Sequence, residues 1–317
     1  MRRRRGRPAV GGGRERGRIP GVLGGGREPE GMNERAALDV VGGLVAGAGD
    51  DAAVVDDAVF TIDMLHETTD FPAGTTRYTA GWRSVGASLS DVAAMGAAAT
   101  AAVGVYGAPD FEESELHAYV EGALDVCEAV DAEYVGGDLD GHDEFTVATA
   151  AVGHSDDPVF RDGATPGDAL VVTGTLGRTA AAMHHFESGD AERANELFRF
   201  EPRVGAGRAL AGHATAMMDS SDGLARSLHQ LAEASGCGFA VDGDSVPVAD
   251  ELRDTVENPL DTAATYGEDF ELVATVPTEA VETVRAAADV PVSVVGEVTD
   301  SGVTLDGEPL ADRGWTH

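Results

Sequence analysis

The sequence contains no lysine. All 22 of its basic residues are arginine, and 56 acidic residues give the 317-residue chain a formal net charge of -34. Without lysine the Walker A pattern G-x-x-x-x-G-K-[ST] cannot occur, and neither can the strand lysine of protein kinases. If the protein handles phosphate groups, the cation that does so must be a metal ion or an arginine.

Cysteines and long apolar runs are also scarce. The two cysteines, Cys127 and Cys237, form neither a disulfide framework nor a C-x-x-C metal knuckle, and we expect both to be reduced. No run of about 18 apolar residues predicts a transmembrane helix, and no apolar segment follows the basic N-terminus as in a secretory signal. With 43% hydrophobic residues, the chain can bury the core of a globular protein, more readily as two domains than as one.

Residues 1–31 differ from the rest of the chain. They hold nine of the arginines, many glycines and only three acidic residues. This composition predicts a disordered leader. A basic arm that binds nucleic acid is one interpretation. We favour another, in which the leader is a start-site artefact, because "MNERAALDVV" from Met32 resembles a natural start.

Residues 32–317 are strongly acidic, with 53 acidic and 13 basic residues. Such a surface repels nucleic acid and anionic membranes. It also repels itself in ordinary salt, whereas at molar salt the Debye length falls to about 3 Å and screens the repulsion. We therefore expect a cytoplasmic protein of a salt-accumulating halophile. A generic acidic protein is the alternative, but it does not explain the missing lysine.

Strand and helix patterns alternate through both halves of the chain after Met32. The turn-rich stretch "RDGATPGD" at 161–168 separates the halves. We expect an α/β (α+β) fold of two mixed α/β domains, 32–157 and 158–317. The predicted strands are 51–55, 58–65, 144–153, 270–276, 292–298 and one from 169, and the predicted helices are 77–97, 113–130, 203–212 and one after Asp222.

The predicted helix 77–97 has an apolar stripe with helical spacing, formed by Trp82, Val85, Leu89 and Val92. Asp91 lies away from this stripe, beside Ser84 and Ser88. We therefore expect these three residues to form a polar face rather than part of the core.

The stretch "MMDSSDGLARSLHQL" (217–231) has two interpretations. Ser221 or Asp222 can cap the helix that follows, because Ser and Asp accept hydrogen bonds from the first N–H groups of a helix. Alternatively, Asp219 and Asp222 bind a ligand. On this segment alone the cap is the simpler interpretation.

Four other motifs contain similar aspartates. They are "GDDAAVV" with Asp50 and Asp51, "TIDMLHETTDFP" with Asp63 and Asp70, "SLSDVAAMG" with Asp91, and "YVGGDLDG", a Gly-rich turn with Asp138 and Asp140. In an acidic chain each motif alone is more simply a solvated charge. Asp63, however, lies in an apolar strand, where an unpaired carboxylate is costly. Carboxylates with few Cys or His suit Mg²⁺, which can in turn bind phosphate groups. The set therefore predicts a nucleotide enzyme with carboxylate-bound metal ions, in which Arg161 is the candidate protein cation.

Taken in order, these motifs resemble the thiamine-monophosphate kinase family. The resemblance adds "RDGATPGDALVVTGTLG", "EPRV", "YGEDFEL" and the terminal "GWTH", and extends from about Met32 to His317. It implies the aminoimidazole-ribotide-synthetase-like superfamily, with a PurM-like architecture and a homodimer formed through the N-terminal sheet. The implied reaction transfers the γ-phosphoryl group of ATP to thiamine phosphate, with several Mg²⁺ ions and no covalent enzyme intermediate.

The resemblance also implies roles for single residues. The implied metal ligands are Asp51, Asp63, Asp91, Asp138, Asp219 and Asp222, with Thr61 as a helper. The implied ATP contacts are Gly137, Asp138, Arg161 and Ser221, and the implied substrate contacts are Glu268 and Trp315. Asp70 replaces a histidine of bacterial members that contacts substrate. It is either a contact to the thiazolium or a metal, or an ordinary turn residue before Pro72.

Two alternatives are open. The first is another enzyme of the superfamily. However, the selenophosphate-synthetase branch needs an N-terminal Cys and Lys, the hydrogenase-maturation branch needs a C-terminal Cys, and the purine-synthesis branch lacks the "YGEDFEL" and "GWTH" pair. The second is a non-catalytic acidic protein that only binds Mg²⁺ or nucleotide.

Overall fold

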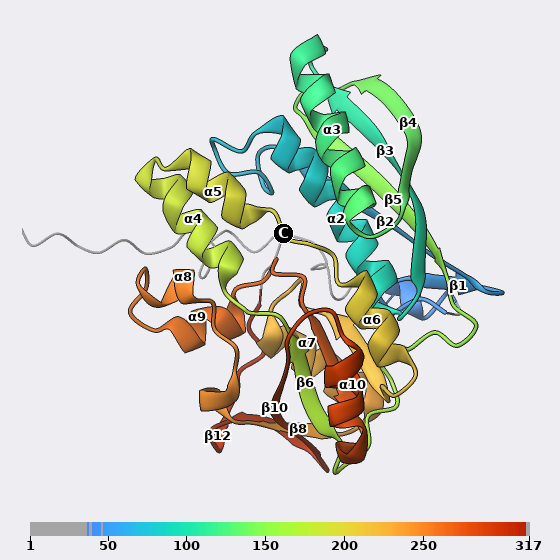
Figure 1. Cartoon of the computed structure of the whole chain (residues 1–317), viewed down its shortest axis with the longest axis vertical. Helices are drawn as coiled ribbons and strands as arrows, with labels where there is room; N and C mark the ends of the chain where they lie inside the picture. The colour runs from blue at the N-terminus through green and yellow to red at the C-terminus, as the bar shows by residue number, and fades with distance from the viewer. Residues whose placement is uncertain (1–36, 38–39, 46, 315–317) are drawn as a thin grey trace, which may run out of the picture.

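The computed structural model describes residues 37, 40–45 and 47–314 (Figure 1). The predicted leader 1–31 and the predicted substrate contact Trp315 lie outside these residues. Within them, two sheets of mixed strands are covered by helices, which confirms the predicted α/β class. Figure 1 shows the two sheets one above the other, with α2 (Arg77–Ala94) and α6 (Val204–Ala211) between them.

The first sheet has five strands in the order β1-β2-β5-β3-β4. All neighbours are antiparallel except β3 and β4. The strands are β1 (Ala53–Val55), β2 (Ala58–His66), β3 (Ala98–Ala108), β4 (Glu133–Gly141) and β5 (Thr146–His154). α2 and α3 (Glu113–Ala129) pack on one face, where the predicted stripe residues Val85, Leu89 and Val92 are buried.

Among the described residues, the opposite face of the first sheet is largely uncovered. Along β2 the side chains alternate, as expected for a strand. Thr61 and Asp63 face α2, whereas Phe60, Ile62 and Met64 point outward with exposed fractions of 43%, 77% and 51%. Val103 and Val105 of β3 extend this apolar surface, because they lie in the same rows as Ile62 and Met64. We call Phe60, Ile62, Met64, Val103 and Val105 the open-face patch.

The second sheet has seven strands in the order β12-β11-β8-β10-β6-β9-β7. They are β6 (Ala169–Thr173), β7 (Ala216–Asp219), β8 (Gly238–Val241), β9 (Leu272–Val276), β10 (Val292–Thr299), β11 (Gly302–Leu305) and β12 (Glu308–Pro309). Leu170 and Val172 of β6 pack into one core with α7 (Leu224–Ser235), and Val171 packs into another with α6 and α10 (Val281–Ala287). Burial on both faces explains why this strand reads as a continuous apolar run.

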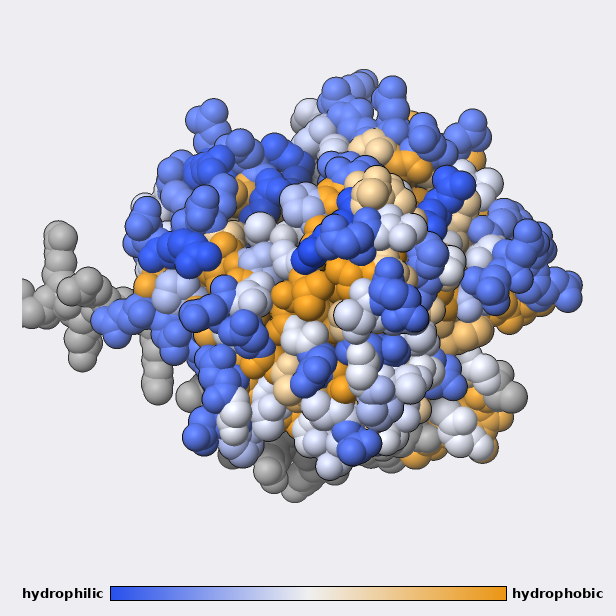
Figure 2. Space-filling model, turned by 60° about the horizontal axis from the view of Figure 1, so that its bottom comes forward, coloured by the Kyte–Doolittle hydropathy of each residue, from blue (hydrophilic) through white to orange (hydrophobic). Residues whose placement is uncertain are grey.

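The other helices of the described residues lie beside α2 and the second sheet. They are α4 (Arg178–Ser188), α5 (Ala191–Phe198), α8 (Asp250–Arg253) and α9 (Pro259–Thr265), with the short 3-10 turns η1 (Gly243–Ser245) and η2 (Thr278–Ala280). No helix in the described part of the chain combines the length and apolar character that a bilayer span needs. Figure 2 shows a face on which hydrophilic side chains surround smaller hydrophobic patches.

Three local predictions are wrong. Ser84 and Ser88 do not form a polar surface, because both are buried against α3 and β5: Ser88 Oγ lies 2.8 Å from Thr149 Oγ1, and Ser84 Oγ lies 3.3 Å from Tyr119 Oη. Asp138 and Asp140 lie in the edge strand β4 rather than in a turn. The N-cap residue of α7 is Gly223, which has φ +94° and no side chain, rather than the predicted Ser221 or Asp222.

Candidate active site

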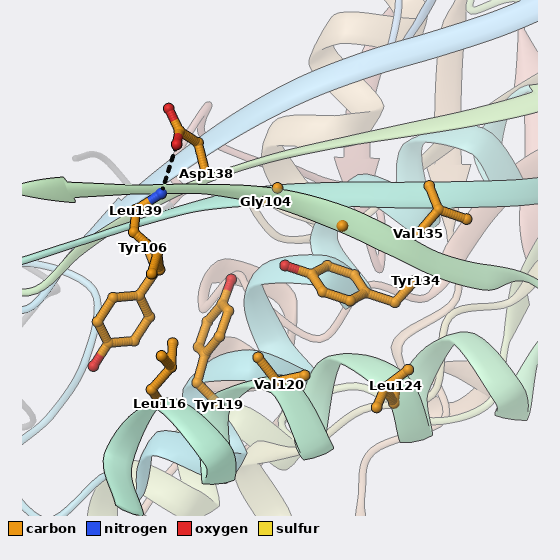
Figure 3. A pocket seen from close by; sticks show the side chains of 12 residues that line it. Gly104, Tyr106, Leu116, Tyr119, Val120, Leu124, Tyr134, Val135, Asp138 and Leu139 are labelled. Carbon is orange, nitrogen blue, oxygen red and sulfur yellow. Dashed lines mark hydrogen bonds between the residues drawn. The ribbon is translucent and has the colours of Figure 1, made fainter. Parts of the chain in front are cut away.

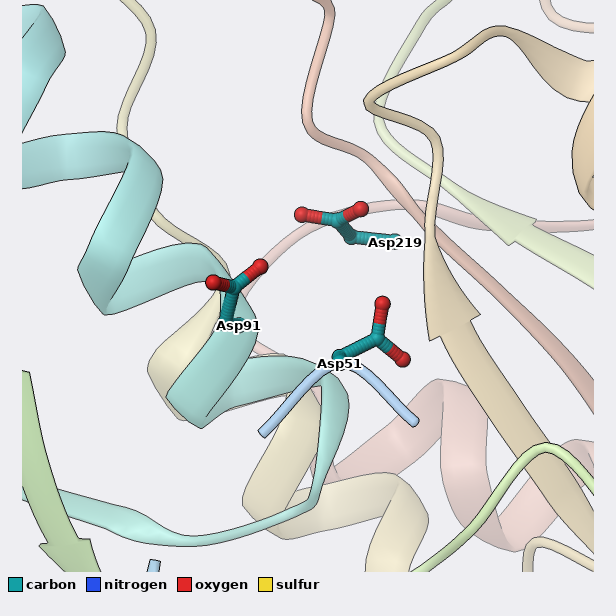
Figure 4. A group of neighbouring side chains, drawn as sticks. All are labelled: Asp51, Asp91 and Asp219. Carbon is teal, nitrogen blue, oxygen red and sulfur yellow. The ribbon is translucent and has the colours of Figure 1, made fainter. Parts of the chain in front are cut away.

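Three carboxylates from distant parts of the sequence meet between the two sheets (Figure 4). Asp51 precedes β1, Asp91 lies in the last turn of α2, and Asp219 ends β7. One ligand oxygen from each lies within 4.8 Å of the others. We call these three residues the carboxylate cluster.

Hydroxyl groups and a backbone amide orient two of these carboxylates. Thr61 Oγ1 donates to Asp91 Oδ2 at 2.7 Å, and Ser90 Oγ donates to Asp219 Oδ2 at 2.7 Å. The backbone N–H of Ser221 donates to Asp219 Oδ1 at 3.1 Å. The structure therefore brings the predicted residues Thr61 and Ser221 into contact with the cluster.

Arg161 supplies a positive charge beside the cluster. Its Nη2 lies 2.7 Å from Asp51 Oδ1, its Nε lies 3.3 Å from Asp51 Oδ2, and its backbone N–H donates to Asp50 Oδ2 at 3.1 Å. Burial lowers the pKa of the guanidinium, but the carboxylates of Asp51 and Asp50 outweigh burial and raise it. Arg161 thus stays charged and balances part of the negative charge.

The remaining negative charge is high enough to perturb the carboxyl groups themselves. Burial, followed by the charges of Asp219 and Asp51, raises the pKa of Asp91 well above its usual 3.8. Burial and the charge of Asp51 raise the pKa of Asp219 to about 7, and burial raises that of Asp50 to about 6. Buried carboxylates this close together require protons or a cation. Their oxygen donors match the ligand preference of Mg²⁺.

Two more predicted ligands lie nearby. Asp63 follows Thr61 on the same face of β2, and its charge contributes to the raised pKa of Asp91. Asp222 is half-buried in the turn between Asp219 and α7. Beside the cluster, a pocket of about 520 Å³ lined by Asp51, Thr61 and Ile62 reaches the open-face patch.

The structure does not bring Gly137 and Asp138 to the cluster. Gly137 shares a row of the first sheet with Asp63, but two strands, β5 and β3, lie between them. Strand spacing makes this separation about 14 Å. Both residues instead line a pocket of about 450 Å³ between β4 and α3, with Tyr106, Tyr119 and Tyr134 (Figure 3).

The predicted substrate residues lie elsewhere. Glu268 is on the loop before β9, where Arg83 Nη2 lies 2.6 Å from its Oε2. Asp70 lies in the turn after β2 and accepts the backbone N–H of His66 at 2.7 Å. Asp70 therefore has a role in this turn.

Sequence reasoning missed Ser90 and Arg83, and it named Asp50 in a motif without giving it a role in the site. Asp50 and Ser90 directly precede the predicted ligands Asp51 and Asp91 in "GDDAAVV" and "SLSDVAAMG". Inspecting the polar residues next to each predicted ligand would have identified both. Arg83 carries no such signal, because its partner is 185 positions away in the sequence.

Comparison with known proteins supports the family resemblance that the sequence motifs indicate. Residues 49–155 match the family model described as AIR synthase related protein, N-terminal domain, and residues 165–307 match the C-terminal domain. The chain is 68% identical to a thiamine-monophosphate kinase of Halobacterium salinarum, over 90% of this chain and 100% of the relative. It is 38% identical to that of Methanospirillum hungatei, over 90% and 99%.

A solved structure, AaThiL complexed with AMPPCP and TMP, has a TM-score of 0.82 and 27% identity to this chain, and covers 90% of this chain and 97% of that one. Similarity at this level extends over both sheets. The chain therefore belongs to the thiamine-monophosphate kinase family, within the AIR-synthase-related proteins.

Proposed function

We propose that this protein transfers the γ-phosphoryl group of ATP to thiamine phosphate, giving thiamine diphosphate and ADP. The observation that carries the proposal is the cluster of Asp51, Asp91 and Asp219, to which three separate motifs of the family each contribute one carboxylate. Relatives at 68% and 38% identity are thiamine-monophosphate kinases. The similar solved structure is of AaThiL complexed with AMPPCP and TMP.

Mg²⁺ fits the cluster, since the site offers carboxylate oxygens and a single arginine. Asp51, Asp91 and Asp219 would hold it, with Thr61, Asp63 and Asp222 as further ligands, whereas the predicted ligand Asp138 lies too far away on β4 to share this ion. Bound Mg²⁺ would neutralise the phosphate groups of both substrates and so allow them to approach. Thr61 and Ser90 hold the carboxylates of Asp91 and Asp219 in place before any ligand arrives.

Phosphoryl transfer in this site needs positioning rather than a strong base. The accepting oxygen of thiamine phosphate is already ionised near neutral pH, so no side chain has to remove a proton from it. Arg161 would contact the phosphates of ATP, and Ser221 would add a polar contact. Gly137 and Asp138 would contact ATP at the pocket between β4 and α3. Asp70, Glu268 and Trp315 would contact thiamine phosphate.

We further propose that the protein is a homodimer whose second copy covers the open-face patch. A contiguous patch of five apolar side chains on an otherwise acidic molecule marks an interface. The pocket beside Asp51 opens at Ile62, so the second copy would also close the active site. The proposed N-terminal domain, 32–157, would form this interface.

A turnover assay tests the reaction. Protein in molar KCl with ATP, Mg²⁺ and thiamine phosphate is expected to produce thiamine diphosphate, measured as its fluorescent thiochrome derivative. Folded protein that binds ATP but forms no product would support the non-catalytic alternative and reject the proposed reaction.

A further inference from the structure

Arg83 is a buried charge in the middle of α2, with 2% of its side chain exposed. Burying a guanidinium is costly unless partners replace its water. Nη2 lies 2.6 Å from Glu268 Oε2 and donates to the Glu268 carbonyl oxygen at 3.3 Å, and Nη1 donates to the Phe198 carbonyl oxygen at 2.5 Å. Arg83 therefore holds both the side chain and the backbone of Glu268.

An aromatic wall fixes the plane of this guanidinium. Its Cζ lies 3.7 Å from the ring centroid of Phe198 and 5.2 Å and 5.6 Å from those of Phe200 and Phe270. Phe200 and Phe270 stack on each other at 4.2 Å. A planar guanidinium stacked in this way has little freedom to turn, and a lysine cannot reproduce the contact.

The loop that carries Glu268 is strained and held from several sides. Glu268 and Phe270 have φ +71° and +54°, which are unfavourable for residues other than glycine. The backbone N–H of Glu268 donates to the Ser221 carbonyl oxygen at 2.7 Å, and Thr179 Oγ1 donates to the Glu268 carbonyl oxygen at 2.8 Å. Strained backbone that several surrounding contacts hold in place is typical of functional loops.

One face of α2 links this loop to the carboxylate cluster. Arg83 and Ser90 are seven residues apart, two helical turns, so they lie on the same face about 10 Å apart. Ser90 orients Asp219, and Arg83 holds Glu268. α2 thereby sets the distance between the cluster and Glu268.

We propose that Arg83 is a positioning residue that fixes Glu268 as a hydrogen-bond acceptor for an N–H donor on the substrate's heterocycle, in thiamine phosphate the amino group of its pyrimidine. This inference rests on the proposed function. Arg83 is 2% exposed and the Glu268 side chain 15%, so the pair presents mainly its carboxylate to a ligand. Because Arg83 neutralises that carboxylate, the pair selects by hydrogen bonding rather than by attracting a cation.

The test compares Arg83→Lys and Arg83→Gln with the wild type in the turnover assay. Loss of a fixed geometry at a substrate contact costs up to about 10²-fold. We expect the KM for thiamine phosphate to rise about tenfold in Arg83→Lys and further in Arg83→Gln, with the KM for ATP changed less than about twofold. In a Glu268→Gln background, Arg83→Lys should add little, because Arg83 acts through Glu268.

Arg199→Lys is the matched control. Arg199 follows Phe198 at the end of α5 and packs on α2 through Thr79 Oγ1, at 3.0 Å, and the ring of Tyr78, without a contact to Glu268 among those described. This variant should lower the melting temperature without a selective change in either KM. If both KM values rise together in the Arg83 variants, or neither changes, Arg83 is only structural and the inference is wrong. Absence of turnover by the wild type would reject the proposed function as well.

Discussion

Asp219 is a fully buried carboxylate that must be ionised to bind a metal ion. When the metal is absent, that buried charge destabilises the folded protein. Its neighbour Asp51 adds repulsion. Asp219→Asn removes the charge and keeps the shape. We expect kcat to fall by about 10²-fold or more, while the metal-free protein melts at the same or a higher temperature.

Steady-state rates and thermal melts with EDTA measure the two effects of Asp219→Asn. A lower melting temperature together with normal turnover would show that Asp219 is structural. Ser90→Ala is the companion variant, because it removes the hydrogen bond to Asp219 and leaves the carboxylate. Its effect on turnover should be smaller than that of Asp219→Asn.

The pH dependence of stability follows from the same carboxyl groups. In the folded protein the pKa of Asp219 is raised to about 7 and that of Asp50 to about 6, from a usual 3.8. The folded state therefore binds these protons more tightly than the unfolded chain does. Their stabilising effect is complete below about pH 4 and is lost as the pH rises through 6 and 7.

Calorimetry of the metal-free protein in molar KCl should therefore show a melting temperature that falls between pH 5 and pH 8. Mg²⁺ binds the ionised carboxylates, so its stabilising effect should grow over the same range. Equal stabilisation by Mg²⁺ at pH 5 and pH 8 would place its binding outside the carboxylate cluster.

Single residues of the site could be predicted only where the sequence motif itself carries the chemistry. Asp51, Asp91 and Asp219 follow from the motifs, and the structure brings their carboxylates together. Arg83 does not, because nothing in a helix sequence tells which distant loop an inward-facing residue meets. The cap assigned to Ser221 or Asp222 is wrong, since the chain turns once more and α7 begins after Gly223.

Among the elements, β4 shows how close packing dictates sequence. A Cβ on Gly137 would lie 1.7 Å from the Gly104 carbonyl oxygen of β3, far inside contact distance. Gly137→Ala should force β4 away from β3. We expect a fall in melting temperature of about 5 °C or more and a higher KM for ATP, because Gly137 also lines the pocket beside α3.

Gly141→Ala is the control for Gly137→Ala. It lies in the same strand, and an added Cβ there meets nothing within 4 Å. If both substitutions lower the melting temperature equally, the cause is the replacement of any glycine in β4 by alanine and not the close approach of Gly104 to Gly137.

α2 shows where element prediction stops. Its extent and its apolar stripe could be predicted, because periodicity marks one buried face. The buried serines beside the stripe could not, since Ser84 and Ser88 meet partners on α3 and β5, and neither could the second buried face, where Ala87 packs on Phe200 and Phe270. A helix between two sheets can bury serines, provided each finds a hydrogen-bond partner.

For the whole molecule, the open-face patch is the test of assembly. Ile62 is 77% exposed and lies in the same sheet row as Val103. Ile62→Asp places a charge at the centre of the proposed interface and should convert a dimer to a monomer, measured by light scattering in molar KCl. Leu124→Asp on α3, 47% exposed, lies off this face and should leave the dimer intact. A wild-type protein that is monomeric at micromolar concentration would reject the proposed homodimer.

The charge of the whole chain predicts how its stability depends on salt. Net charge is -34 and arginine is the sole basic side chain, so long-range repulsion opposes folding unless ions screen it. Lowering KCl from about 1 M to about 0.1 M lengthens the screening distance from about 3 Å to about 10 Å. The melting temperature should fall steeply over this range, and MgCl₂ should restore it at much lower concentration than KCl.

Sucrose stabilises folded proteins by exclusion from their surface and does not screen charge. If sucrose restored the melting temperature as fully as KCl does, screening of the repulsion between acidic side chains would not be the cause of the salt dependence.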